Sequence, residues 1–187
     1  MMRKIFVIYF LWGTLGMFAQ TTMREIIKSM PDTIVPYLTE NNRLDFIDFI
    51  DSGMKAEVSN MLGGKSEMSK LTDRYTYITL NEASTLQLRL LDTEIPVDSA
   101  NQIVCLVQTY GTNVRESKIT FYSLKWRRLP TTDYIVLPDG MWIATLDDES
   151  PILTLMPEVQ LDTPANEEQE QLPKSSTILK WDGNILK

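Results

Sequence analysis

Six acidic residues, in two groups, come nearest to a catalytic site by their types and spacing. They are Asp92, Glu94, Asp98, Asp147, Asp148 and Glu149. The first three fall in a predicted loop, and the last three lie at the end of a predicted strand. A glycosidase needs a carboxylic acid and a carboxylate about 5 to 9.5 Å apart across the scissile bond. Charged turns are common in soluble proteins, so solvated turns are the favoured interpretation.

A further acidic series, Asp45, Asp48 and Asp51, recurs every third residue of a predicted helix. Such a row places two or three carboxylates near one side of the helix, where calcium or a substrate can bind. Calcium takes about 6 to 8 oxygen ligands, and a rigid helix supplies too few of them. The series therefore indicates a solvated helix face, and we predict no metal site and no cofactor.

The chain contains no histidine and one cysteine, Cys105. These counts exclude Ser-His-Asp and Cys-His nucleophiles, zinc sites built on imidazole or on four cysteines, and an internal disulfide. Cys105 lies in the apolar run 103–107, which predicts a buried, inert thiol. Carboxylate chemistry, a Ser/Lys or Tyr/Lys pair and an oxygen-ligand metal site remain open, but we predict no catalytic residue.

Trp126, Arg127, Arg128 and Trp142 are the residues we predict for an interaction site. Trp126 and Trp142, with Trp181, can form an aromatic platform for a sugar or a peptide. Aromatic residues in strands more often pack in the core or across strands. The basic residues beside Trp126 also have a plainer interpretation, as a charged strand end at the surface.

Residues 1–20 resemble a secretory signal peptide. Arg3 and Lys4 precede an apolar run of about 13 residues, which is shorter than the roughly 20 that a membrane-spanning helix needs. We expect cleavage after Ala19 or Gln20, no transmembrane segment afterwards, and a periplasmic or secreted product. The alternative is an anchor that stays in place.

The full chain carries a net charge of −7, and removal of Arg3 and Lys4 makes the remainder still more acidic. Nucleic-acid binding requires basic side chains that displace counterions from phosphates, and the sequence offers no basic stripe with interleaved aromatic residues. We therefore predict no nucleic-acid partner. The expected partner is a protein, a peptide or another component of the cell envelope.

Helical signals occupy the predicted helical part, residues 22–62. Thr22 and Glu25 fit a capping box, and Pro31 ends that helix. A second helix begins at Asn41 or Asn42 and stops at Gly53. A further helical turn is predicted for residues 55–62.

In the predicted sheet part, residues 66–161, the pattern of side chains changes toward an alternation of every second residue, which is typical of β-strands. Strands are expected at 75–80, 86–91, 102–110, 118–126, 134–137, 141–146 and 152–156, then an acidic loop at 162–173 and a last strand at 177–181. Helices followed by strands predict one α+β domain over residues 21–187, with N-terminal helices packed on one face of a largely antiparallel β-sheet. The other face, or an edge strand, is then free for a partner.

Three segments carry a resemblance that spans nearly the whole chain after the leader. They are MPDTIVPYLTENNRLDFIDFIDSGMKAEVSNMLGGKSEMSKLT (30–72), VDSANQIVCLVQTYG (97–111) and ITFYSLKWRRLP (119–130). The chain resembles a family of uncharacterised small exported proteins of Gram-negative gut-type bacteria. The resemblance implies a shared α+β fold and export, and it transfers no catalytic residue.

The sequence thus favours a non-catalytic binding or interaction module of the cell envelope. The alternative is a carboxylate-dependent hydrolase acting on glycans. A third interpretation is a subunit of a surface assembly, which an unpaired edge strand and a detachable segment 177–187 would support.

Overall fold

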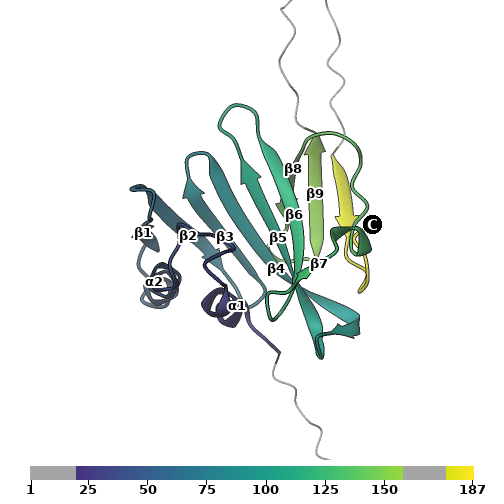
Figure 1. The fold of residues 1–187 in the computed structure, drawn as a ribbon, viewed down its shortest axis with the longest axis horizontal. Coiled ribbons are helices and arrows are strands. Elements are labelled where there is room, and N and C mark those ends of the chain that lie inside the picture. The colour runs from purple at the N-terminus through teal and green to yellow at the C-terminus, as the bar shows by residue number, and fades with distance from the viewer. Residues whose placement is uncertain (1–19, 158–175) are drawn as a thin grey trace, which may run out of the picture.

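A computed structural model of the chain describes residues 20–157 and 176–187. The structure has three layers: two helices, a seven-stranded main sheet and a three-stranded small sheet, and Figure 1 shows the helices below the left half of the main sheet and the small sheet at its right. The predicted α+β class, with helices packed on one face of a largely antiparallel sheet, is confirmed. The predicted leader and the predicted acidic loop at 162–173 lie outside the described residues.

Helices α1 (Met23–Ser29) and α2 (Glu40–Asp51) both begin with a reciprocal capping box. The box of Thr22 and Glu25 is as predicted. The second helix is capped by Thr39, not by Asn41 or Asn42, because the Asn42 side chain accepts a hydrogen bond from the Thr39 backbone in return. Among the described residues, no helix combines the length and the apolar character that crossing a membrane requires.

The helical turn predicted at 55–62 is wrong, because strand β1 (Glu57–Ser59) lies there. The Asn60 side chain closes the turn that follows β1: its Oδ1 accepts hydrogen bonds from the Leu62 and Gly64 backbones, and its Nδ2 donates to the Leu80 carbonyl. Because the Asn60 side chain binds these backbone groups, they are paired without a helix, and the bonds stabilise the turn.

The main sheet is antiparallel throughout, in the order β1-β2-β3-β4-β5-β6-β7. Its other strands are β2 (Lys65–Leu71), β3 (Tyr75–Asn81), β4 (Ser84–Val97), β5 (Ala100–Tyr110), β6 (Glu116–Ser123) and β7 (Arg128–Leu129). The hairpin of β5 and β6 is confirmed, but β6 ends at Ser123 and not at Trp126.

The small sheet has the order β10-β9-β8, from β8 (Trp142–Leu146), β9 (Ile152–Pro157) and β10 (Thr177–Lys180). The strands predicted at 141–146, 152–156 and 177–181 are confirmed, each to within one residue at either end. The strand predicted at 134–137 is wrong: the 3-10 helix η1 (Thr131–Asp133) precedes it, and only Ile135 makes an isolated bridge, to Leu186.

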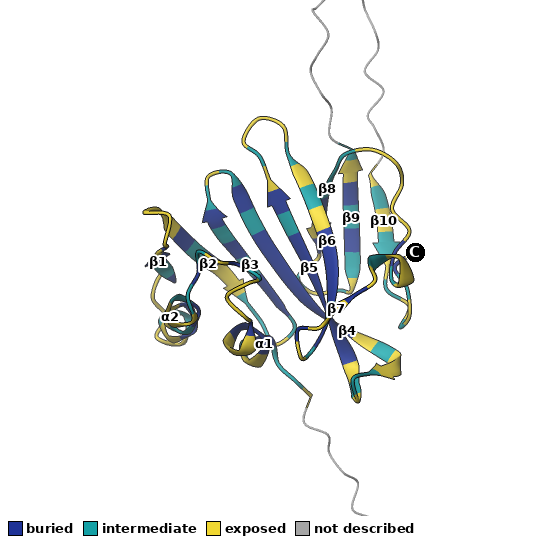
Figure 2. Cartoon of the chain, in the orientation of Figure 1, coloured by how far each residue is buried: buried dark blue, intermediate teal, exposed yellow. Residues whose placement is uncertain are grey.

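Two hydrophobic cores lie on opposite faces of the main sheet, where Figure 2 shows its central strands in dark blue. The first core joins the helices to the main sheet through fully buried side chains such as Phe46, Ile27 and Leu88. The second core joins the two sheets through residues such as Phe121, Cys105 and Leu155.

The second core overturns the expectation that one face of the main sheet is free. The small sheet covers that face over β4, β5 and β6. Cys105 is completely buried there, and burial raises the pKa of its thiol to about 12. The predicted inert thiol is therefore confirmed, and an uncovered apolar surface has to be sought elsewhere.

Candidate interaction surface

The outward face of the small sheet is the most unusual surface of the described chain. Residues alternate between the two faces of each strand. Ala144, Leu146, Leu153 and Leu155 point into the second core. Their neighbours point outward, and we call them the outer face: Ile143, Thr145, Ile152, Thr154, Met156, Ile178 and Lys180.

Four of these outward residues are large and apolar, although the outward face of an antiparallel sheet is usually polar. Ile143 pairs with Met156 across β8 and β9, and Ile178 pairs with Thr154 across β9 and β10. Met156 is 46% exposed and Ile178 is 59% exposed. Contiguous apolar side chains in solvent are typical of a surface that binds another molecule.

Side chains of the main sheet hold the free edge of β8 in place. The Leu146 backbone N–H donates to Gln87 Oε1 at 2.9 Å, and the Ala144 N–H donates to Ser117 Oγ at 2.9 Å. These two polar side chains accept the hydrogen bonds that the backbone of a neighbouring strand would otherwise accept from the β8 N–H groups. They fix the small sheet on the main sheet, so the outer face is a rigid surface.

Arg89 secures the turn between β8 and β9. Its side chain is buried, at 2% residue exposure, and donates from Nη1 to the Asp147 carbonyl at 2.5 Å and from Nη2 to the Glu149 carbonyl at 2.9 Å. Burial lowers the pKa of the guanidinium, with nearby Arg74 adding to the shift. The role of Arg89 is to anchor this turn from beneath.

The C-terminal segment is firmly attached, which removes one support for a surface-assembly subunit. Leu186 is buried in the second core and donates its N–H to the Tyr134 carbonyl at 2.8 Å. The Trp181 indole donates to the Asp92 carbonyl at 2.5 Å, and Asn184 Nδ2 donates to Glu94 Oε2 at 2.8 Å. The segment closes the fold instead of standing apart from it.

Five of the six acidic side chains considered for the hydrolase alternative are held by local partners. Asp98 accepts two hydrogen bonds from Arg127, which lowers the pKa of its carboxyl to about 2. The backbone N–H groups of Ser150 and Glu149 lower the pKa of Asp147. These shifts favour the ionised form, whereas a glycosidase also needs an acid with a raised pKa.

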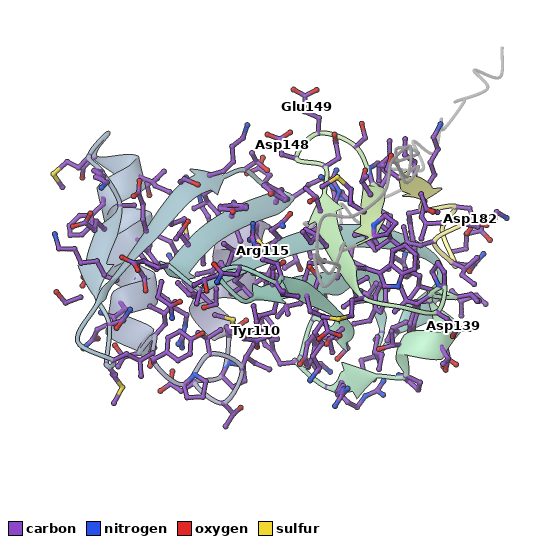
Figure 3. All side chains as sticks on the ribbon, turned by 90° about the horizontal axis from the view of Figure 1, so that it is seen from above. Tyr110, Arg115, Asp139, Asp148, Glu149 and Asp182 are labelled. Carbon is purple, nitrogen blue, oxygen red and sulfur yellow. The ribbon has the colours of Figure 1, made fainter. Side chains whose placement is uncertain are left out.

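The other acidic side chains are spread over different surfaces. Asp92 pairs with Arg74 at 2.8 Å, and Asp148 pairs with Lys70. Figure 3 shows Asp148 and Glu149 at one margin of the molecule, well apart from Asp182, whose segment holds Glu94 through Asn184. The arrangement therefore gives the hydrolase alternative no support.

The helical series has the solvated character that we expected. Asp45, Asp48 and Asp51 are all exposed, and Asp51 forms an ion pair of 2.7 Å with Arg24. Within residues 20–157 and 176–187, no group of three or more Cys, Asp and Glu side chains is placed to hold a metal ion.

Trp126, predicted in a strand, instead lies in the turn between β6 and β7 with a φ of 61°. Its side chain is 8% exposed, belongs to the first core, and donates from Nε1 to Ser29 Oγ at 3.2 Å. A non-glycine residue in this conformation is strained, so the packing against α1 and Tyr122 has to offset the strain. Trp126 therefore joins the turn to the helical layer.

The structure does not bring the four predicted interaction residues together. Arg127 and Arg128 lie exposed beside Trp126, and Arg127 is engaged with Asp98. Trp142 packs against the second core, on the opposite face of the main sheet, and its indole donates to the Pro138 carbonyl at 3.0 Å. Trp126, Trp142 and Trp181 therefore form no common platform, and a binding role of the individual residues stays a prediction.

Residues 14–162 match a family described as a protein of unknown function, DUF3256. The chain belongs to the DUF3256 family. This match covers most of the chain and confirms that it belongs to a family of unknown function, while export stays a prediction. No protein of curated function matches the sequence.

The fold of this DUF3256 chain is similar to a solved domain of an uncharacterized protein from Porphyromonas gingivalis W83. The TM-score is 0.73 at 18% identity, over 90% of this chain and 98% of the other. At this identity the likeness concerns the fold alone.

Proposed function

We propose that this DUF3256 protein is an exported, non-catalytic binding module of the cell envelope that docks a partner protein on its outer face. The observation that carries the proposal is the set of outward apolar residues on the small sheet, above all Met156 and Ile178. They add nothing to the second core, because their side chains point away from it.

The construction of the small sheet supports a docking role. Gln87, Ser117 and Arg89 fix β8 and its turn to the main sheet. A rigid surface loses little conformational entropy when a partner binds. An apolar centre on such a surface is the usual core of a protein interface.

A pair of lysine substitutions tests this function. Ile178→Lys places a charge on the outer face, whereas Ile95→Lys places one near the end of β4, outside the outer face, where Ile95 is 71% exposed. We expect a protein that copurifies with the tagged full chain from the envelope fraction to be lost with Ile178→Lys and kept with Ile95→Lys. Equal recovery with both variants contradicts the proposal, and so does equal loss.

Export is the second part of the proposal, and the charged and apolar pattern of residues 1–20 supports it. Mass spectrometry of the protein from its native cells tests it. We expect the chain to begin at Gln20 or Thr21 and to fractionate with the periplasm or the medium. A product that retains Met1 in the cytosol contradicts export without affecting the docking proposal.

A further inference from the structure

A cleft beside the small sheet is a second candidate site, separate from the outer face. It lies where the main sheet continues past the small sheet, which contacts β4, β5 and β6. The cleft is shallow and open to solvent, with a volume of about 500 Å³, and is lined by β2, β3, the end of β8 and the β8–β9 turn. We propose that this inter-sheet cleft binds a saccharide.

Two tyrosines of β3 line the cleft on the side of the main sheet. Tyr75 and Tyr77 lie two residues apart and therefore on the same face of the strand. Tyr75 is buried and donates to Gln87 Oε1 at 3.4 Å, which fixes the ring. Tyr77 is half-buried, and its hydroxyl makes no hydrogen bond with the described residues.

Polar side chains from both sheets form the walls. Lys70 of β2 makes an ion pair with Asp148 of the β8–β9 turn and so links the two sheets. Ser69 of β2 adds an exposed hydroxyl. The cleft therefore offers both donors and acceptors at its rim.

The wall on the side of the small sheet is fixed before any ligand arrives. Arg89 holds the carbonyls of Asp147 and Glu149 from beneath, and Asp147 Oδ1 accepts hydrogen bonds from the Glu149 and Ser150 backbones. A turn held in this way loses little entropy when a ligand binds. This rigidity suits a ligand that makes many weak polar contacts.

The chemistry of the lining selects the ligand class. A sugar presents C–H groups that stack on tyrosine rings and hydroxyls that bond to carboxylate, ammonium and hydroxyl groups. The carboxylates of Asp147 and Asp148 oppose a polyanion, and the two tyrosine rings supply the apolar area on which one face of a sugar can stack. A neutral saccharide satisfies both conditions.

Amide chemical-shift mapping of the exported chain tests the saccharide site, with chitotriose and maltotriose as probes. We expect one of these trisaccharides to shift the amides of residues 69–70, 75–77 and 145–148. Tyr77→Ala should weaken the binding about tenfold, which corresponds to about 1.4 kcal/mol. Tyr110→Ala, a 44% exposed tyrosine away from the cleft, is the matched control and should leave binding unchanged.

A second variant protects the test against misfolding. Ser69→Arg keeps both tyrosines, places a long side chain in the cleft from an exposed position on β2, and should abolish the shifts. The proposal is overturned if neither trisaccharide moves the cleft amides at 20 mM, or if the shifts persist in both Tyr77→Ala and Ser69→Arg. Since Ile178→Lys leaves the cleft intact, its effect on a protein partner reports on the outer face alone.

Discussion

The helical layer and the small sheet cover opposite faces of the same main sheet, yet they differ in what they turn toward solvent. Helix α2 buries Phe46 and Ile47 and exposes Asp45, Asp48 and Asp51. The small sheet buries Leu153 and Leu155 and exposes Met156 and Ile178. The first layer is amphipathic in the ordinary sense, whereas the second is apolar on both faces.

The two layers also differ in how they are attached. The helices rest on the main sheet through the first core, with hydrogen bonds to its edges and turns from Met23 N–H to the Asp73 carbonyl, from Asn42 Nδ2 to the Ser59 carbonyl and from Trp126 to Ser29. The small sheet combines the second core with polar bonds from Gln87, Ser117 and Arg89. The comparison teaches that one layer completes the fold, while the other is built to present a surface.

The largest expected effect tests the helical layer. Phe46 is completely buried in the first core, so Phe46→Ala should destabilise the protein by about 3 to 5 kcal/mol. Urea denaturation measures this change in the free energy of unfolding. Asp48→Asn, on the exposed side of the same helix, should leave the midpoint nearly unchanged, and equal midpoints for both variants would show that the helix does not bury this side.

A neighbouring pair on β9 tests the small sheet. Leu155→Ala should cost about 2 to 5 kcal/mol because Leu155 is fully buried in the second core. Met156→Ala should change the free energy of unfolding by less than about 0.5 kcal/mol because its side chain points outward. Thermal and urea unfolding compare the two variants. A large loss with Met156→Ala would mean that the outer face is part of a core.

The polar attachment of β8 is tested by Gln87→Leu. The substitution leaves the buried Leu146 N–H without its acceptor, which should cost about 1 to 3 kcal/mol. Hydrogen exchange should accelerate first at Leu146. Gln108→Leu, at a half-buried position on β5, is the control, and similar exchange at Leu146 in both variants would contradict the role of Gln87.

The smallest effect concerns the exposed pair of Asp98 and Arg127. Arg127 lowers the pKa of Asp98 to about 2, so the stabilising contribution is present above the ordinary pKa of aspartate, near 3.8, and is lost as pH falls toward 2. In Arg127→Gln the pKa of Asp98 should rise toward its ordinary value. NMR titration of the Asp98 carboxyl measures the shift, and an unchanged pKa would exclude Arg127 as its main cause.

Local signals in the sequence were sufficient for much of the fold. The capping box of Thr22 and Glu25 and the alternation along β3 follow from neighbouring residues, and so did their prediction. The helical turn predicted at 55–62 was wrong because Asn60 stabilises a turn there through hydrogen bonds to Leu80 and Ser66. Those partners come near Asn60 only when the chain folds, so the local sequence does not reveal them.

The outer face could not be predicted because the strands of the small sheet carry apolar residues on both of their faces. Ile143 and Ala144, or Leu155 and Met156, give no sign of which side faces a core. Only the placement of the small sheet over β4, β5 and β6 decides it. For the same reason, Trp126 and Trp142 were grouped in the sequence although they lie on opposite faces of the main sheet.

Site-specific photocrosslinking in native cells tests the docking surface most directly. A photoreactive phenylalanine analogue is placed at Ile178, on the outer face, and in a separate strain at Ile95, where exposure is comparable at 71% against 59%. We predict a discrete adduct of higher mass from Ile178 that does not form from Ile95. The same adduct from both positions, or none from Ile178, contradicts the account.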